Sequence, residues 1–146
     1  MITIRKAAFS DAAAVTALAL QLWPDHETQA LQTEFEPLLT DANAAVFLAY
    51  SGDSPVGFAQ CQLRHDYVEG TSSSPVGYLE GIFVLPAYQK QGIARSLLFS
   101  CESWTREQGC SEFASDCELG NTDSLRFHRS MGFEEANRII CFTKKL

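Results

Sequence analysis

Positive charge is scarce in this sequence. Lysine and arginine together number 11, against 18 aspartate and glutamate residues, and the net charge at pH 7 is −7. A protein that binds nucleic acid or an anionic membrane surface needs a basic patch, so this charge balance argues against both kinds of partner. It favours a cationic partner instead, provided that the acidic side chains line the binding site.

Long apolar runs are also missing. No stretch of eighteen apolar residues is present, so we expect no membrane-spanning helix. The opening residues, MITIRKAAFSD, lack an apolar signal segment and a cleavage site, which predicts a cytoplasmic protein. A length of 146 residues and a hydrophobic fraction of 46% suit one domain, residues 1–146, with its own core.

Metal-ligand spacings are absent too. The five cysteines form no C-x-x-C pair, and the three histidines lie at no ligand spacing from them. We therefore expect no metal site and no catalytic cysteine, and in a reducing compartment we expect the thiols to be buried. The residues concerned are Cys61, Cys101, Cys110, Cys117, Cys141, His26, His65 and His128.

Two nucleotide-binding fingerprints, G-x-G-x-x-G and G-x-x-x-x-G-K-[ST], do not occur. What is present, between Tyr78 and Leu98, is an apolar run, a turn with Gly92 and a helical pattern. The first amides of a helix are unpaired and the helix dipole is positive there, so such a turn can bind phosphate. Lys90 and Arg95 add positive charge beside it. The alternative is an ordinary turn before a helix.

The turn from Gln89 to Ala94 reads Q-x-x-G-x-A. It resembles the acetyl-CoA loop, [QR]-x-x-G-x-[GA], of the GCN5-related N-acetyltransferases (GNAT). That family continues with a strand, an asparagine, an aromatic residue seven positions later, and Gly-Phe. Here the predicted strand from Glu112 to Cys117, Asn121, His128 and Gly132-Phe133 follow in the same order.

The predicted elements have the order β-α-α-β-β-β-α-β-α-β, which is the order of that superfamily. We therefore predict its α/β (α+β) fold, a mixed central sheet in which two parallel strands splay apart. The predicted strands are 2–6, 45–50, 56–63, 78–85, 112–117 and 139–143, with a further short strand near 133 left open. The predicted helices are one that ends at 22, then 27–39, 92–108 and 122–131.

The resemblance implies that acetyl-CoA enters the gap between the splayed strands. Its pantetheine arm would pair with a free strand edge as an added strand does, and its pyrophosphate would lie on the amides of the glycine turn. The cofactor-binding residues implied in this way are Ile82, Phe83, Val84, Gln89, Gln91, Gly92, Ile93, Ala94, Arg95, Asn121 and His128.

Two of these residues have alternative roles. Asn121 can bind the CoA arm, as the family's asparagine does, or cap the helix that follows it. His128 stands where the family usually has a tyrosine that is thought to protonate the departing thiolate. A charged histidine can do the same, and it can equally be a helix residue packed under the cofactor.

Further shared strings extend over nearly the whole chain: Trp23–Asp25, Arg64–Thr71, Ser73–Gly77, Leu79–Ile82, Glu112–Asp116 and Phe142–Lys145. They resemble the chromosomal-type aminoglycoside 6'-N-acetyltransferases. The strings SSPV, LEGI and EFASD are more specific than the cofactor motif. The resemblance implies acetyl transfer from acetyl-CoA to the 6'-amine of an aminoglycoside, which confers resistance.

Two carboxylates suit that chemistry. The acceptor amine must lose a proton before it attacks a thioester carbonyl, and a nearby carboxylate can accept the proton. Glu80, just before the apolar run, and Asp116, at the carboxyl end of the next strand, are the predicted catalytic residues, with Asp116 the preferred base. Strand alternation places Phe113 and Ser115 on one face and Asp116 on the other. Each carboxylate can alternatively be a solvated strand-end residue.

Aromatic and acidic residues extend the predicted substrate site. Flat aromatic faces suit sugar rings and ammonium groups, although Trp23 and Tyr67 can instead be core or lid residues. Asn137 stands where the family often has an acidic residue, and its neutral amide can accept a hydrogen bond from the substrate but supplies no charge. The predicted substrate-binding residues are Trp23, Asp25, Tyr67, Glu80, Asp116 and Asn137.

Other functions remain open at this point. The acceptor can be a polyamine or a protein amine, or the domain can bind CoA or a partner without turnover. Relatives are often homodimers, and the resemblance implies an interface formed by the final strands.

Overall fold

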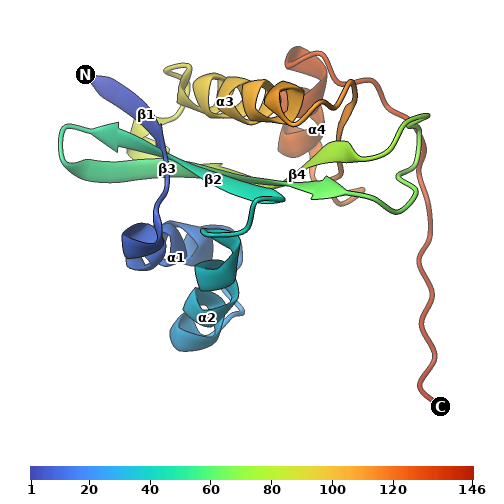
Figure 1. The fold of residues 1–146 in the computed structure, drawn as a ribbon, viewed down its shortest axis with the longest axis horizontal. Coiled ribbons are helices and arrows are strands. Elements are labelled where there is room, and N and C mark those ends of the chain that lie inside the picture. The colour runs from blue at the N-terminus through green and yellow to red at the C-terminus, as the bar shows by residue number, and fades with distance from the viewer.

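The computed structural model describes residues 1–146, and Figure 1 shows a central sheet with helices on both faces. The strands are β1 (Ile2–Lys6), β2 (Ala44–Ser51), β3 (Ser54–Arg64), β4 (Val76–Val84) and β5 (Phe113–Ser115). The helices are α1 (Ala12–Leu22), α2 (Thr28–Leu38), α3 (Ile93–Glu107) and α4 (Thr122–Ser130), with short 3₁₀ helices η1 (Phe9–Asp11) and η2 (Pro86–Tyr88). All predicted elements up to α4 form, with ends that differ by at most two residues. None of the helices combines the length and the apolar character that crossing a membrane requires.

The five strands lie in the order β1-β2-β3-β4-β5. The first four are antiparallel to their neighbours, and β4 runs parallel to β5. The parallel pair is short, because it extends only from Gly77 beside Phe113 to Leu79 beside Ser115. From Glu80 onward β4 has no neighbour on that edge, so the two strands part, as the fold prediction required.

Strand alternation separates two apolar layers. On β2, for example, Ala45 and Ala49 face the cluster that includes Leu97 of α3, whereas Val46 and Leu48 face the cluster of α1 and α2. Figure 1 shows the same arrangement, with α3 and α4 on one side of the sheet and α1 and α2 on the other. The predicted inner face of α3 is confirmed, because Ile93, Leu97, Cys101 and Trp104 are all buried.

A bulge in β4 changes the direction of its side chains. Gln60 lies opposite Gly81, but the next residue of β3, Cys61, lies opposite Leu79, so Glu80 is an extra residue on β4. Such a bulge kinks a strand and re-aims the side chain at the bulge. Here Glu80 and Gly81 both face the α1–α2 side, because Leu79 and Ile82 pack in the α3 layer and Gly81 meets Trp23.

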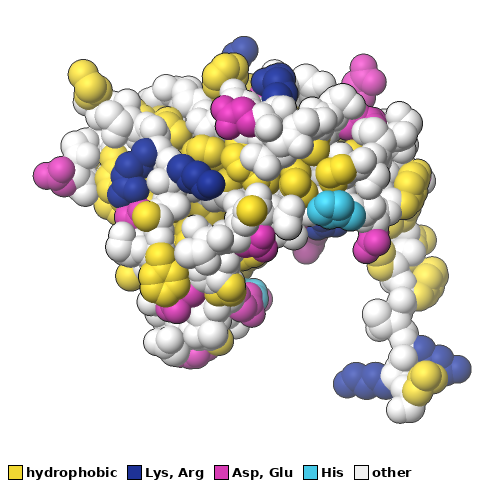
Figure 2. Space-filling model, in the orientation of Figure 1, with side chains coloured by type: hydrophobic (Ala, Val, Ile, Leu, Met, Phe, Trp, Pro, Cys, Tyr) yellow, Lys and Arg dark blue, Asp and Glu magenta, His cyan; other side chains and the backbone are white.

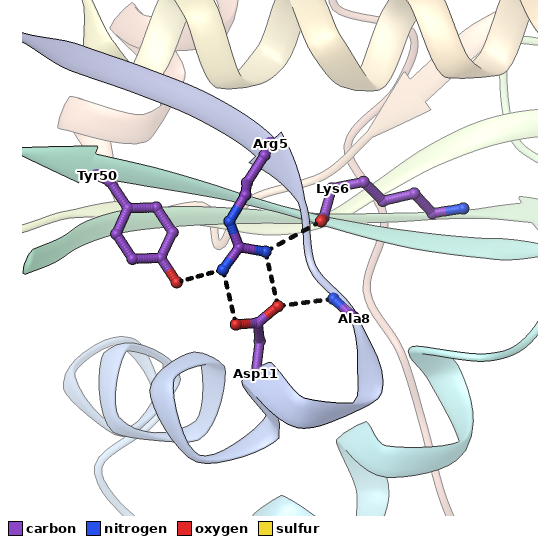
Figure 3. Close-up of polar contacts among 5 residues, drawn as sticks. All are labelled: Arg5, Lys6, Ala8, Asp11 and Tyr50. Atoms are coloured by element: carbon purple, nitrogen blue, oxygen red, sulfur yellow. Dashed lines mark hydrogen bonds and ion pairs between the residues drawn. The ribbon is translucent and has the colours of Figure 1, made fainter. Parts of the chain in front are cut away.

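A polar cluster joins β1 to the start of α1 (Figure 3). The Arg5 guanidinium donates to both carboxylate oxygens of Asp11, at 2.8 Å each, and to the Tyr50 hydroxyl at 2.9 Å. Asp11 also accepts a bond from the Ala8 amide at 2.8 Å. The hydrogen bonds from Arg5 lower the pKa of Asp11 to about 2.

The C-terminal segment differs from the prediction. No strand forms over 139–143 or near Phe133, and the chain after α4 leaves the body as an extended tail (Figure 1). Ile139, Ile140 and Phe142 are exposed by 69%, 81% and 87%. The strand predicted over 139–143 is wrong for this single chain. The segment has the composition of a strand, but a strand needs a partner edge to supply its hydrogen bonds, and no strand of this chain pairs with the tail.

The thiols divide into two groups. Cys61, Cys101 and Cys110 are buried, as predicted, whereas Cys117 and Cys141 are exposed, which corrects the prediction for these two. Both exposed thiols lie in segments without regular structure, after β5 and in the tail, where no layer covers them. No three His, Cys, Asp or Glu side chains are grouped in a way that could hold a metal ion.

Candidate active site

Four polar side chains meet on the α1–α2 side of the sheet where β4 and β5 part: Arg64, Tyr78, Glu80 and Asp116. Tyr78 and Glu80 come from β4, and Arg64 ends the neighbouring strand β3. Asp116 directly follows β5 and, as alternation predicted, it contacts Tyr78 while Ser115 bonds to α4 on the other side. The two predicted catalytic carboxylates therefore lie on one face, close to the opening between the strands.

Arg64 binds Glu80 through two parallel hydrogen bonds. Its Nη2 lies 2.8 Å from Glu80 Oε1, and its Nε lies 3.1 Å from Oε2. The guanidinium also lies over the Tyr78 ring, 3.5 Å from the ring centroid. The bonds to Glu80 raise the pKa of Arg64, so the guanidinium is held as a cation between an anion and an aromatic face.

Tyr78 connects this pair to Asp116. The ring is buried and its hydroxyl donates a short hydrogen bond to Asp116 Oδ2. Burial, followed by the bond to Asp116, raises the pKa of Tyr78, so the hydroxyl keeps its proton and remains a donor. Asp116 itself is at the surface, where a substrate can reach it.

Trp23 lies beside the same strand. It follows the last turn of α1, where its amide donates to the Ala19 carbonyl at 2.8 Å. Its ring is half-buried and meets Phe58 edge-on at 6.1 Å between centroids. The ring edge covers Gly81, and a Cβ at that position would lie 2.6 Å from Trp23 Cη2. The indole is thus held against β4 at the residue that follows Glu80.

The segment from His65 to Pro75 is fastened to β5 by Glu112. One carboxylate oxygen of Glu112 accepts from the Ser72 amide at 2.9 Å and from the Ser73 hydroxyl at 2.5 Å. The bond from Ser73 contributes most to a lowered pKa of Glu112. Tyr67 lies on this loop and is 76% exposed, so its ring is available on the rim rather than packed in the core.

The remaining predicted substrate residues lie at the surface. Asn137 donates to Glu69 at 3.0 Å and so fastens the start of the tail to the loop. Asp25 is exposed in the turn after α1 and has no hydrogen bond or ion pair within the protein. Figure 2 shows the molecule hollowed on this side, between the α1–α2 lobe and the tail. Arg64 and Tyr78 therefore link Glu80 to Asp116, Trp23 lies against Gly81 next to Glu80, and the other predicted substrate residues lie on the rim.

The glycine turn has the geometry that phosphate binding needs. Gly92 caps the start of the long helix α3 with φ +82°, a left-handed conformation, and no atom lies within 4 Å of the place where a Cβ would be. The first helical bond goes from the Ser96 amide to the Gly92 carbonyl, which leaves the amides of Ile93, Ala94 and Arg95 unpaired. These donors and the open backbone fit a pyrophosphate group.

The edge of β4 beyond Leu79 leads to this turn. Ile82, Phe83 and Val84 belong to the part of β4 that has no neighbour on the β5 side. The Gln89 side chain donates to the Val84 carbonyl at 2.9 Å. Gln89 therefore has a structural role in joining the turn to the strand, in addition to the cofactor role predicted for it.

Asn121 and His128 both make structural contacts in addition to the cofactor roles predicted for them. The Asn121 side chain caps α4 by accepting from the Ser124 amide at 3.1 Å. His128 Nδ1 lies 2.7 Å from the Ser124 carbonyl, and Nε2 lies 2.7 Å from the Ser115 hydroxyl. A neutral ring protonated on Nδ1 satisfies both contacts, so His128 joins α4 to β5.

Three residues of the site were missed by the sequence prediction. Arg64 and Glu112 stood inside recognised strings without a role, and Tyr78 was assigned only to a strand. One signal was available, since Arg64 is a lone cation in a segment of the chain where acidic residues prevail. The pairing itself depends on the register of β3 against β4, which the sequence pattern does not specify.

Known proteins resemble the chain over most of its length. A model of the Acetyltransferase (GNAT) family matches residues 12–133. Aminoglycoside N(6')-acetyltransferase type 1 of Stenotrophomonas maltophilia is 48% identical over 99% of this chain and 94% of its own length. The protein of the same name from Salmonella typhimurium is 42% identical over 88% of each chain.

Solved structures agree with these similarities. AAC(6')-Iy in complex with the bisubstrate analogue CoA-S-monomethyl-acetylneamine has a TM-score of 0.95 at 38% identity, covering 100% of this chain and 99% of that one. The aminoglycoside 6'-N-acetyltransferase AAC(6')-Ih from Acinetobacter baumannii has a TM-score of 0.93 at 39% identity, with the same coverage.

Proposed function

Because the chain belongs to the Acetyltransferase (GNAT) family, we propose that it is an aminoglycoside 6'-N-acetyltransferase that confers resistance by acetylating the 6'-amine of these antibiotics. The predicted family and fold are confirmed, and the predicted activity agrees with that named for relatives along nearly the full chain. The observation that carries the proposal is the pair Glu80 and Asp116 on one face of the sheet, at the opening between β4 and β5. A polycationic amino sugar matches two carboxylates beside an indole face.

Acetyl-CoA, the co-substrate, supplies the thioester carbonyl that is attacked. The residues present fit this molecule, because β4 has a free edge over Ile82–Val84 and the amides of Ile93, Ala94 and Arg95 are unpaired beside Gly92. We assign the pantetheine arm to the strand edge and the pyrophosphate to the helix start. A backbone N–H of the free β4 edge is placed to stabilise the oxyanion that forms.

We assign the binding and the deprotonation of the acceptor amine to the two carboxylates. Asp116 accepts the amine's proton, directly or through one water, and Glu80 binds the ammonium form by a charge-assisted hydrogen bond. Trp23 supports a sugar ring, while Tyr67, Asp25 and Asn137 form the rim. His128, with both ring nitrogens engaged, acts as a packing residue and not as the thiolate's proton donor.

We further propose that the enzyme is a homodimer whose tails pair with a second copy of the chain. The outer edge of β5 has no partner strand, and the tail presents three exposed apolar residues, Ile139, Ile140 and Phe142. An unpaired edge and an unpaired apolar strand complement each other. We place this assembly, acting as one catalytic domain per chain, in the cytoplasm, where acetyl-CoA is available.

The test compares three amines in a thiol-release assay with acetyl-CoA. Tobramycin has a 6'-amine, its counterpart paromomycin has a 6'-hydroxyl, and spermidine is a linear polyamine. Thiol release with tobramycin and none with paromomycin is expected. Release with spermidine alone would move the acceptor to a polyamine, and no release with any amine would identify a CoA-binding domain without turnover.

A further inference from the structure

The two predicted catalytic carboxylates are linked by a continuous chain of contacts. Glu80 is bound by Arg64, the Arg64 guanidinium lies on the Tyr78 ring, and the Tyr78 hydroxyl donates to Asp116. This series of contacts begins on β3, passes through β4 and reaches the end of β5, so it spans the point where the sheet opens. The two carboxylates at its ends differ in how many of their oxygens accept hydrogen bonds within the protein.

The carboxylate oxygens of Glu80 and Asp116 differ in the hydrogen bonds that they accept. Both oxygens of Glu80 accept from Arg64, whose charge is complementary, and the Glu80 side chain is only 17% exposed. Asp116 accepts from a neutral hydroxyl through Oδ2, and Oδ1 has no hydrogen-bond partner within the protein. A proton on Glu80 would weaken a bidentate ion pair, whereas a proton on Asp116 Oδ1 disturbs no contact.

We propose that Arg64 and Tyr78 are positioning residues that select Asp116 Oδ1 as the proton acceptor and hold Glu80 as an ion-paired acceptor of hydrogen bonds. This assignment rests on the proposed acetyltransferase function and specifies how its two carboxylates divide their roles. Arg64 acts through Glu80, and Tyr78 acts through Asp116. Neither positioning residue needs to touch the reacting atoms.

The experiment is a pair of double-mutant cycles on turnover. Arg64→Gln is expected to lower kcat about tenfold, since it removes a charge-assisted bond, and to leave the KM for acetyl-CoA unchanged. Arg64→Lys keeps the charge without the fork and is expected to restore part of the loss. Tyr78→Phe removes only the hydroxyl and is also expected to lower kcat about tenfold.

The cycles separate action through a partner from independent action. In a Glu80→Gln background, Arg64→Gln should have no further effect on kcat, and in an Asp116→Asn background, Tyr78→Phe should have none. Effects that multiply in both backgrounds would overturn the proposal. A larger loss of kcat in Glu80→Gln than in Asp116→Asn would overturn it as well, because Glu80 would then be the base.

The chain contains a matched control at the opposite edge of the sheet. Arg5 also binds a carboxylate through two bonds and lies over a tyrosine ring, at 4.8 Å from the Tyr50 centroid (Figure 3). Arg5→Gln should reduce stability but leave kcat unchanged, and an equal loss of kcat in this variant would assign the Arg64 effect to folding.

The amines that wild-type protein acetylates separate a failure of the proposed function from a failure of the positioning roles. If wild type acetylates spermidine but no aminoglycoside, the proposed function fails, and the cycles are run with spermidine and still decide the roles of Arg64 and Tyr78. If wild type acetylates no amine, both proposals fail. Active wild type with independent effects in the cycles refutes only the positioning roles.

Discussion

Asp116 depends on its immediate surroundings for its proposed role. It follows β5 directly, it is exposed, and one of its oxygens is fixed by Tyr78. Glu80 faces the same side as Tyr78 because Leu79 between them packs in the α3 layer, and Trp23 owes its place to the absence of a side chain at Gly81. Small features of single residues thus decide which groups lie at the predicted substrate site.

Asp116→Asn should lower kcat by about a hundredfold or more, because the amide cannot accept the proton of the amine. Acetyl-CoA binding, measured by calorimetry, should stay unchanged. Asp123→Asn is the matched control, since Asp123 is a carboxylate at the exposed start of α4, 95% exposed. Turnover of Asp116→Asn equal to that of the control would remove Asp116 from catalysis.

Gly81→Ala should raise the KM for the aminoglycoside several-fold, because the new Cβ would lie 2.6 Å from Trp23 and must displace the indole. The KM for acetyl-CoA should change less. Gly120→Ala serves as the control, since nothing lies within 4 Å of a Cβ there and its backbone angle is ordinary. An unchanged aminoglycoside KM in Gly81→Ala would mean that Trp23 does not contact the substrate.

Among the secondary-structure elements, α3 has two comparable ends. Gly92 stands before its first turn with φ +82°, and Gly109 follows its last turn with φ +86°. At neither position does an atom lie within 4 Å of the place that a Cβ would take, so both tolerate a Cβ sterically and both strain the backbone. Only the Gly92 end carries unpaired amides that can bind an anion.

Gly92→Ala and Gly109→Ala should therefore cost similar stability, about 1 kcal/mol each, through backbone strain. Only Gly92→Ala should also weaken acetyl-CoA binding, because it crowds the pyrophosphate and disturbs the amides. Thermal unfolding and calorimetric titration with acetyl-CoA measure the two effects separately. Equal acetyl-CoA affinity in both variants would show that the pyrophosphate binds elsewhere.

The junction of β1 with η1 and α1 makes stability sensitive to acid. The pKa of Asp11 falls from 3.8 to about 2 in the folded state, mainly through its bonds to Arg5. A lowered carboxyl pKa contributes stability that is complete above 3.8 and is lost as the pH falls toward 2. Asp11→Asn should therefore cost about 1 kcal/mol at pH 7, where Arg5 is half exposed to solvent, and almost nothing near pH 2. A cost that is independent of pH in denaturant titrations would contradict this.

At the scale of the whole molecule, the tail is the segment that finds no strand partner and no apolar cover within one chain. Its apolar side chains are exposed and so contribute no burial free energy to the single chain. The hydrogen bond between Asn137 and Glu69 fixes the point where the tail leaves the body. A second copy supplies the missing partner if the two tails pair with neighbouring sheet edges.

Ile140→Asp should therefore convert the proposed dimer to a monomer, because it places a charge in the apolar contact. Phe99→Asp is the control, since Phe99 is an exposed apolar residue on α3, far along the chain from the tail. Light scattering coupled to gel filtration measures the mass. A monomeric wild type, or an equal effect of both substitutions, would refute the tail-mediated dimer.

Much of the fold and the identity of the family follow from the sequence by itself. Periodicity and the family resemblance together located every strand and α-helix up to α4, because an amphipathic helix or a half-buried strand carries its pattern in consecutive residues. Local motifs likewise indicated the Gly92 turn and the carboxylates Glu80 and Asp116. These signals concern neighbours along the chain, and a single sequence records them directly.

The tertiary structure alone decided which distant residues meet. Arg64 and Glu80 come together through the register of β3 on β4 and through a bulge, and Tyr78 reaches Asp116 only because β5 ends beside it. The tail is an example in which the sequence pattern predicts an element that does not form, since 139–143 has the composition of a strand but no partner edge within its own chain. Composition and periodicity describe what a segment can form, whereas pairing depends on the geometry of segments that are far apart in the sequence.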